Sequence, residues 1–168
     1  MTQHPSVPRD EQAGRRRALE LIWRALSRRA HTVAEMHALL ERRGVQPGAA
    51  AEALEEVAAS GYLDDVDFAR RFVEDRRRLD RWGGERIARE LGRRGVEADV
   101  VARALEGQTV EDELDAACAL LAERLPAPPA DDRARNRALG LLVRRGYRPE
   151  VAYEAVRHHG REVRVPAE

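Results

Sequence analysis

The sequence predicts an all-α protein made of three tandem three-helix repeats that form an elongated, curved, solenoid-like body. The first observation is composition, because Ala, Leu, Arg and Glu dominate and aromatic residues make up only 4% of the 168 residues, a mix that favours helix over strand. The second is a tripeptide that recurs at a constant interval, which is the signature of a repeat architecture. Short units that bury their apolar faces against neighbours stack into extended bodies suited to contact along a long partner.

The repeated tripeptide is Arg-Arg-Gly, and its glycines lie 51 residues apart. Each copy predicts the end of a helix. Glycine adopts the left-handed conformation without steric cost, the arginines complement the negative end of the helix dipole, and a hydrophobic residue after the glycine folds the chain back. Pro47 and Pro149 lie where the next helix would begin. The three copies are Arg42-Arg43-Gly44, Arg93-Arg94-Gly95 and Arg144-Arg145-Gly146.

We assign residues 14–63 to the first repeat, after a flexible N-terminal tail over residues 1–13. Its first helix, which extends to about Arg29, is marked by four apolar residues at helical spacing: Leu19, Ile22, Trp23 and Leu26. A Thr-x-x-Glu capping box at Thr32 opens the second helix. The third helix is expected over residues 47–59.

Residues 64–108 form the second predicted repeat. Asp64 caps a helix that the glycines at 83 and 84 interrupt, and two helices follow, the last over residues 98–106. The helix that Asp64 caps carries Phe68, Phe72 and Leu79, and the helix that follows the glycines carries Ile87 and Leu91.

Residues 109–160 form the third predicted repeat, followed by a C-terminal tail over residues 161–168. Thr109 caps its first helix, which carries Leu114, Cys118, Leu121 and Leu125 and stops at a loop over Pro126–Pro129. Two further helices are expected over residues 131–145 and 149–159.

The side chains predict no catalytic centre, no cofactor site and no metal site. The chain contains no lysine and no Gly-x-Ser-x-Gly elbow, which excludes a Walker A loop, a Schiff-base lysine and a hydrolase nucleophile of that type. The spacing of His31 and His37 does not place both on one helix face. The acidic cluster Asp64, Asp65 and Asp67 stands at a helix start, where carboxylates cap and complement the dipole. We therefore predict that the protein is not an enzyme.

A cytoplasmic location is expected. No apolar stretch approaches the roughly 20 residues that a membrane span needs, and the start of the chain does not resemble a signal peptide. The single cysteine, Cys118, cannot form an internal disulfide and has alanine and leucine neighbours, as is typical of a buried thiol in a reducing compartment.

The arginines are the candidate binding residues. The formal net charge is zero, and all 30 basic residues are arginine, but basic and acidic segments alternate along the chain and can form separate faces. A solvated charged face is the alternative to phosphate contact, and Trp82 could be either a stacking residue or core. The predicted contact set, for a protein filament or for DNA, is Arg76, Arg77, Arg78, Arg81, Arg86, Arg89, Arg93 and Arg94.

Two segments resemble a known family, the RecX regulatory proteins. The first is Gly61-Tyr62-Leu63-Asp64-Asp65 with Phe68-Ala69, and the second comprises Gly84, Arg86-Ile87, Glu90-Leu91 and Arg94-Gly95. For the first segment we expect a mainly structural role: Tyr62 and Leu63 pack between repeats, and Asp64 caps a helix.

The resemblance implies a regulator of the RecA recombinase that acts in homologous recombination, DNA repair and the SOS response. Such a protein binds in the groove of the RecA–DNA filament and inhibits ATP hydrolysis, filament extension and strand exchange. The implied partners are the RecA filament and, more weakly, single- and double-stranded DNA, with no membrane and no cofactor, and the protein is expected to be a monomer. The alternative is a helical DNA-binding protein that acts without a recombinase.

Overall fold

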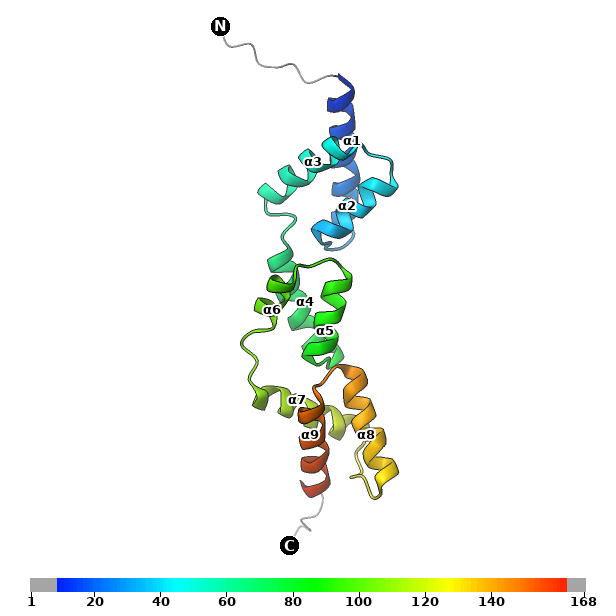
Figure 1. Cartoon of the computed structure of the whole chain (residues 1–168), viewed down its shortest axis with the longest axis vertical. Coiled ribbons are helices and arrows are strands. Elements are labelled where there is room, and N and C mark those ends of the chain that lie inside the picture. Colours follow the sequence, from blue (N-terminus) through cyan, green and yellow to red (C-terminus); the bar gives the residue numbers. More distant parts are fainter. Residues whose placement is uncertain (1–8, 163–168) are drawn as a thin grey trace. The chain divides into compact units, whose positions relative to one another are not determined.

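The computed structural model describes residues 9–162, and every regular element in that range is an α-helix. The helices are α1 (Arg9–Leu26), α2 (Val33–Arg42), α3 (Pro47–Ala59), α4 (Asp65–Asp80), α5 (Gly84–Arg93), α6 (Ala98–Leu105), α7 (Val110–Arg124), α8 (Asp132–Arg145) and α9 (Pro149–Glu162) (Figure 1). The prediction of an all-α helical-repeat fold is confirmed. No helix in this range is long and apolar enough to cross a lipid bilayer.

The chain divides into two compact units. The first unit contains the chain up to Ala69 together with Arg93–Val100, and the second contains Arg70–Gly92 and the chain from Val101 onward. The division passes through α4, α5 and α6, so the helices of the middle repeat contribute to both units.

The core of the first unit lies among α1, α2 and α3, which pack as a three-helix bundle (Figure 1). Its fully buried side chains include Ile22 on α1, Met36 and Leu40 on α2, and Val57 on α3. Apolar residues at helical spacing on each helix supply one buried face, and burial of a Leu, Ile, Met or Val side chain stabilises the fold by about 1.5–3 kcal/mol.

The core of the second unit includes the α7, α8 and α9 bundle. Leu120 and Leu121 of α7, Leu142 of α8 and Tyr147 after α8 are buried almost completely. Burial raises the pKa of Tyr147 to about 12, so its hydroxyl stays protonated and can donate a hydrogen bond. Cys118 is half-buried beside this cluster.

The helix ends follow the predicted turn chemistry. Gly44, Gly95 and Gly146 have φ values of 69°, 79° and 86°. At two of them the backbone makes the paired hydrogen bonds of a Schellman ending, with Val45 N–H donating to Leu40 O and Tyr147 N–H donating to Leu142 O, both at 3.1 Å. Pro47 and Pro149 are the first residues of α3 and α9, as predicted.

The caps also agree with the sequence. Thr32 and Thr109 form capping boxes with Glu35 and Asp112. The side chain of Asp64 accepts hydrogen bonds from two N–H groups in the first turn of α4, at 2.8 and 3.1 Å.

Several local predictions are wrong. Helix α1 begins at Arg9, inside the segment expected to be a tail, because Asp10 and Glu11 in its first turn complement the helix dipole. It ends at Leu26 rather than near Arg29, and Gly84 is the first residue of α5 rather than part of the break before it. Residues 1–8 and 163–168 of the expected tails lie outside the described range.

Three apolar side chains that were expected to pack are exposed. Tyr62 is 67% exposed and meets the ring of Trp23 edge-on, with centroids 5.0 Å apart. Trp23 itself is 41% exposed, and Leu79 is 67% exposed at the end of α4. Helical spacing places a residue on a face, but the width of the buried stripe depends on which neighbouring helix covers that face.

Candidate functional site

Three of the eight predicted contact arginines make contacts within the second unit. The guanidinium of Arg76 pairs with Asp80 at 2.5 Å and lies 5.2 Å from the centre of the Trp82 ring. Arg86 also lies over that ring, at 4.1 Å. Trp82 is half-buried between neighbours that include these two cations, so its indole has a structural role in cation–π contacts.

Arg77 is the third arginine that the fold uses. It is half-buried, and its guanidinium donates to Leu105 O at 3.4 Å. Burial lowers the pKa of Arg77, against the opposing effect of the nearby carboxylates Glu113 and Asp112. A guanidinium held in this way has little freedom to reach an external phosphate.

Three other members of the predicted set in the second unit are exposed. Arg78 pairs with Asp75 at 3.3 Å and Arg89 with Glu85 at 3.8 Å, and both pairs are too exposed to contribute much stability. Arg81 is exposed and has a φ of 54°. These three side chains are therefore the accessible part of the predicted set in this unit.

The remaining two arginines belong to the first unit. Arg93 is exposed. Arg94 lies against the start of α2, where its guanidinium approaches Glu35 at 3.6 Å and lies 5.6 Å from the centre of the Phe68 ring.

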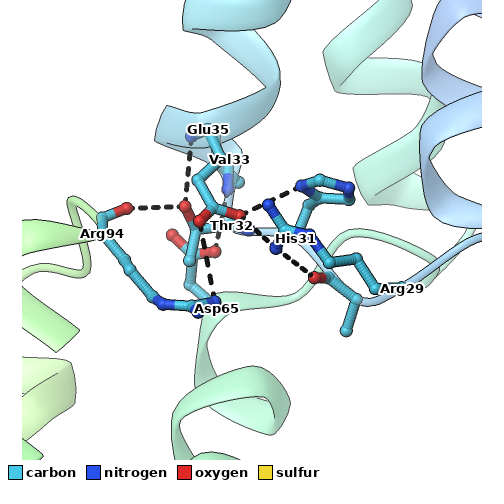
Figure 2. Close-up of polar contacts among 8 residues, drawn as sticks. Arg29, His31, Thr32, Val33, Glu35, Asp65 and Arg94 are labelled. Carbon is cyan, nitrogen blue, oxygen red and sulfur yellow. Dashed lines mark hydrogen bonds and ion pairs between the residues drawn. The ribbon is translucent and has the colours of Figure 1, made fainter. Parts of the chain in front are cut away.

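The start of α2 is the centre of a polar network in the first unit, shown in Figure 2. Thr32 is fully buried, and its hydroxyl donates to the carbonyl oxygen of Arg94 at 2.6 Å while accepting from Glu35 N–H at 3.1 Å. The carboxylate of Asp65 accepts from Val33 N–H at 2.9 Å. A side-chain carboxylate and a backbone carbonyl from later in the chain thus contact the α2 N-terminus, whose first N–H groups have no intrahelical partner.

Two basic side chains of this network approach the carboxylate of Glu35. Its carboxylate lies 3.2 Å from Arg29 and 3.1 Å from Nδ1 of His31 (Figure 2). Burial and the charge of Arg29 lower the pKa of His31, and burial raises the pKa of Asp65.

A second junction, within the second unit, has the same register. The N–H of Gly83 donates to Arg145 O at 2.8 Å, and the N–H of Glu85 donates to Gly146 O at 3.1 Å. Gly83 and Arg145 lie 51 residues after Thr32 and Arg94, so they occupy the corresponding positions one repeat later. In each case the C-terminal end of one repeat's second helix meets the N-terminus of the preceding repeat's second helix, so opposite ends of two helix dipoles face each other.

The Arg-Arg-Gly tripeptide therefore has a second role that helix-end chemistry alone did not predict. A Cβ on Gly146 would lie 2.3 Å from the Cβ of Arg86, and a Cβ on Gly95 would lie 2.4 Å from the Cβ of Ala34. At Gly44, in the first repeat, nothing lies within 4 Å of that position. The last two glycines are thus needed for close approach as well as for the turn.

The segment with family resemblance is mostly part of this framework. Gly61 has a φ of 74° in the turn after α3, Leu63 is 3% exposed in the first core, and Ala69 is fully buried. Asp64 caps its own helix, whereas Asp65 caps α2 across the junction. Tyr62 is the exception, as its ring is largely exposed.

A basic groove in the second unit was missed by the sequence analysis. It has a volume of about 760 Å³ and lies between the end of α7 and one face of α8. Arg133, Arg137 and Arg144 are spaced by four and seven residues, which places them on one face of a helix, and this pattern could have indicated the groove. Its lining is Arg124, Leu125, Arg133, Asn136, Arg137, Leu141 and Arg144.

A smaller basic groove in the first unit, of about 380 Å³, is lined in part by Arg29, Arg42, Arg93 and Arg94. It also contains Glu35, which pairs with Arg29 and Arg94. Part of its positive charge is therefore neutralised internally. Across the described residues, no group of three or more His, Cys, Asp or Glu side chains is arranged to hold a metal ion.

The chain is similar to one family of known proteins both in sequence and in fold. Residues 64–105 match the family described as RecX, second three-helix domain. The regulatory protein RecX of Mycobacterium avium is 38% identical over 158 residues, which cover 92% of this chain and 87% of the relative. That of Deinococcus radiodurans is 35% identical over 91% of this chain and 73% of the relative.

A solved structure shows the same fold. The crystal structure of RecX from Lactobacillus salivarius aligns with a TM-score of 0.74 at 18% identity, and the alignment covers 89% of this chain and 96% of that one. On the identity and coverage of its relatives, the chain belongs to the RecX family of regulatory proteins.

Proposed function

We propose that this chain regulates the RecA recombinase by binding in the groove of the RecA–DNA filament and inhibiting its ATP hydrolysis, extension and strand exchange. The observation that carries the proposal is similarity to regulatory proteins named RecX over about nine tenths of the chain. The helical-repeat construction supports it, because such folds present extended surfaces to long partners.

The two junctions support a binding role rather than a catalytic one. Their polar groups are used internally: the Thr32 hydroxyl contacts a backbone carbonyl and a backbone N–H, and the Asp65 carboxylate caps a helix. A group that already holds a helix end in place is not available to transfer a proton to a substrate. These side chains attach one repeat to the next.

We assign filament contact first to Arg78 and Arg89, the accessible members of the predicted set that carry only weak exposed ion pairs. Arg77 is a poor probe of the same surface, since it is half-buried and contacts Leu105 O. A loss of regulation on changing Arg77 would not separate binding from folding.

The test is ATP hydrolysis by the cognate RecA on single-stranded DNA, titrated with this protein as a monomer of verified mass. We expect inhibition at less than one chain per RecA subunit, and weaker inhibition by the Arg78→Glu/Arg89→Glu variant. No change in hydrolysis at equimolar protein would refute the proposal. Full inhibition by the double variant would move the contact to another face.

A second candidate function is DNA binding without a recombinase. The α7–α8 groove favours it, because four arginines line that groove. The discriminating measurement is binding to the same DNA in the absence of RecA. Tight DNA binding without inhibition of hydrolysis would favour this second function.

A further inference from the structure

We propose that the groove between α7 and α8 is a binding site for the phosphodiester backbone of single-stranded DNA. This inference deepens the proposed function, on which it rests for the presence of DNA at the partner, and its test needs no recombinase. The groove lies wholly within the second unit.

The charge of the groove favours a polyanion. Its lining contains four arginines and no acidic residue among the described side chains. Arg133 and Arg137 are exposed, and within residues 10–161 neither forms an ion pair with a carboxylate. Arg124 has only an exposed contact of 3.5 Å with its neighbour Glu123. The positive charge is therefore not neutralised by the chain itself, unlike that of the groove around Glu35.

The spacing of the arginines favours an extended strand. Arg133 and Arg137 are one helical turn apart, about 6 Å along the axis of α8, and Arg144 is about 16 Å from Arg133 along the same axis. A line of cations along one helix face can follow successive phosphates of one strand. Arginine suits this role because its planar guanidinium can donate two parallel hydrogen bonds to one phosphate.

The apolar part of the groove lining favours a single strand over a duplex. Leu125 and Leu141 line the groove together with the arginines, and Asn136 adds a side-chain amide. An unpaired base can place its face on an apolar surface, whereas the bases of a duplex are stacked inside it. The amide can donate to and accept from a base edge without selecting one base strongly.

Arg135, on the opposite side of α8, and Arg157 of α9 supply a matched control. Arg135 and Arg157 are also exposed, but they pair with Asp132 at 2.7 Å and Glu154 at 3.2 Å. They line a different groove, beside Pro128. The variants Arg133→Gln/Arg137→Gln and Arg135→Gln/Arg157→Gln therefore remove the same charge from the same unit, and only the first removes it from the proposed site.

The experiment is fluorescence anisotropy of a labelled oligothymidylate with the full chain, at a series of salt concentrations. For single strands the logarithm of the binding constant falls with log salt by about 0.7 per phosphate contact, so loss of two contacts should reduce the slope by about 1.4. At about 0.1 M salt this equals a loss of affinity on the order of 25-fold. The control variant should keep the wild-type slope, and far-UV circular dichroism should show equal helicity for both.

Three results would overturn the proposal: no measurable binding by the wild type, equal losses in the two double variants, or an unchanged slope in Arg133→Gln/Arg137→Gln. If that variant keeps its DNA affinity but loses inhibition of RecA, the groove binds an acidic protein surface and the proposal is wrong. Equal binding of the corresponding duplex would refute the assignment to a single strand. Failure of the proposed function is distinct, since a chain that binds DNA through this groove but leaves RecA hydrolysis unchanged refutes only the regulatory role.

Discussion

Replacing Gly146 with alanine tests whether the Arg-Arg-Gly turn also joins the repeats. Gly107 provides the control in the same unit, because its φ of 88° matches the 86° of Gly146 and a Cβ added there would meet nothing within 4 Å. At Gly146 an added Cβ would lie 2.3 Å from the Cβ of Arg86 and 2.4 Å from its backbone nitrogen. The two substitutions share the cost of a left-handed alanine and differ in the collision.

The structure allows the difference to be worked out. A left-handed alanine costs about 1 kcal/mol, which applies to both variants. The collision at Gly146 involves backbone, so it is relieved only by separating the helix ends that the Gly83 N–H to Arg145 O and Glu85 N–H to Gly146 O hydrogen bonds hold together at 2.8 and 3.1 Å. Each such bond contributes about 1 kcal/mol. We therefore expect Gly107→Ala to lower the free energy of unfolding by about 1 kcal/mol and Gly146→Ala to lower it by about 3 kcal/mol.

The assay is urea unfolding followed by the fluorescence of Trp82. The chain contains two tryptophans, so a Trp23→Phe background leaves a single reporter in the second unit, next to the junction. A difference of about 2 kcal/mol corresponds to a separation of about 1 M urea between the two midpoints. Equal midpoints would refute the reasoning, because the glycine would then serve only the helix ending.

Three further outcomes follow from contacts in the two units. Arg77→Glu should destabilise the second unit by about 2 kcal/mol, because it buries an unpaired carboxylate, whereas Arg78→Glu should change the thermal midpoint little; equal effects would contradict the burial of Arg77. Asp65→Ala should cost about 1 kcal/mol by leaving the Val33 N–H uncapped, and Asp65→Asn should restore most of this because asparagine caps equally well; no rescue, measured by urea unfolding, would count against the cap. The lowered pKa of His31 means that the unfolded state binds the proton more readily than the folded state. The stability that His31 contributes is therefore present above its unfolded pKa of about 6.5 and is lost as pH falls through its folded pKa. His31→Asn should weaken this acid sensitivity, and an unchanged pH profile of unfolding would show that His31 does not cause it.

Much of the fold could be predicted because its signals are local. The glycines after each Arg pair, the prolines at helix starts and the Thr-x-x-Glu box at Thr32 each act on residues only a few positions away. The φ values and caps of the structure agree with them. The apolar faces of α1 and α4 were predicted less well, because the exposure of Trp23 and Leu79 depends on which helix covers each face.

The candidate site could be predicted only in part. The sequence shows how many arginines cluster in the middle of the chain, but not which of them have internal partners. Arg77, for example, donates to Leu105 O across 28 residues of sequence, and Arg86 lies over Trp82. Counting charge along the chain therefore overestimated the accessible part of the predicted set and did not reveal the arginines that line the groove at α8.

Residue type and spacing along the chain predict the helical class, the 51-residue period, the ends of most helices and the family resemblance. The contacts of the repeated tripeptide, the accessibility of each arginine and the position of the basic groove follow only from how the helices pack. The physical reason is that a guanidinium or a backbone carbonyl has many possible partners along the chain, and packing brings only a few of them within hydrogen-bonding distance.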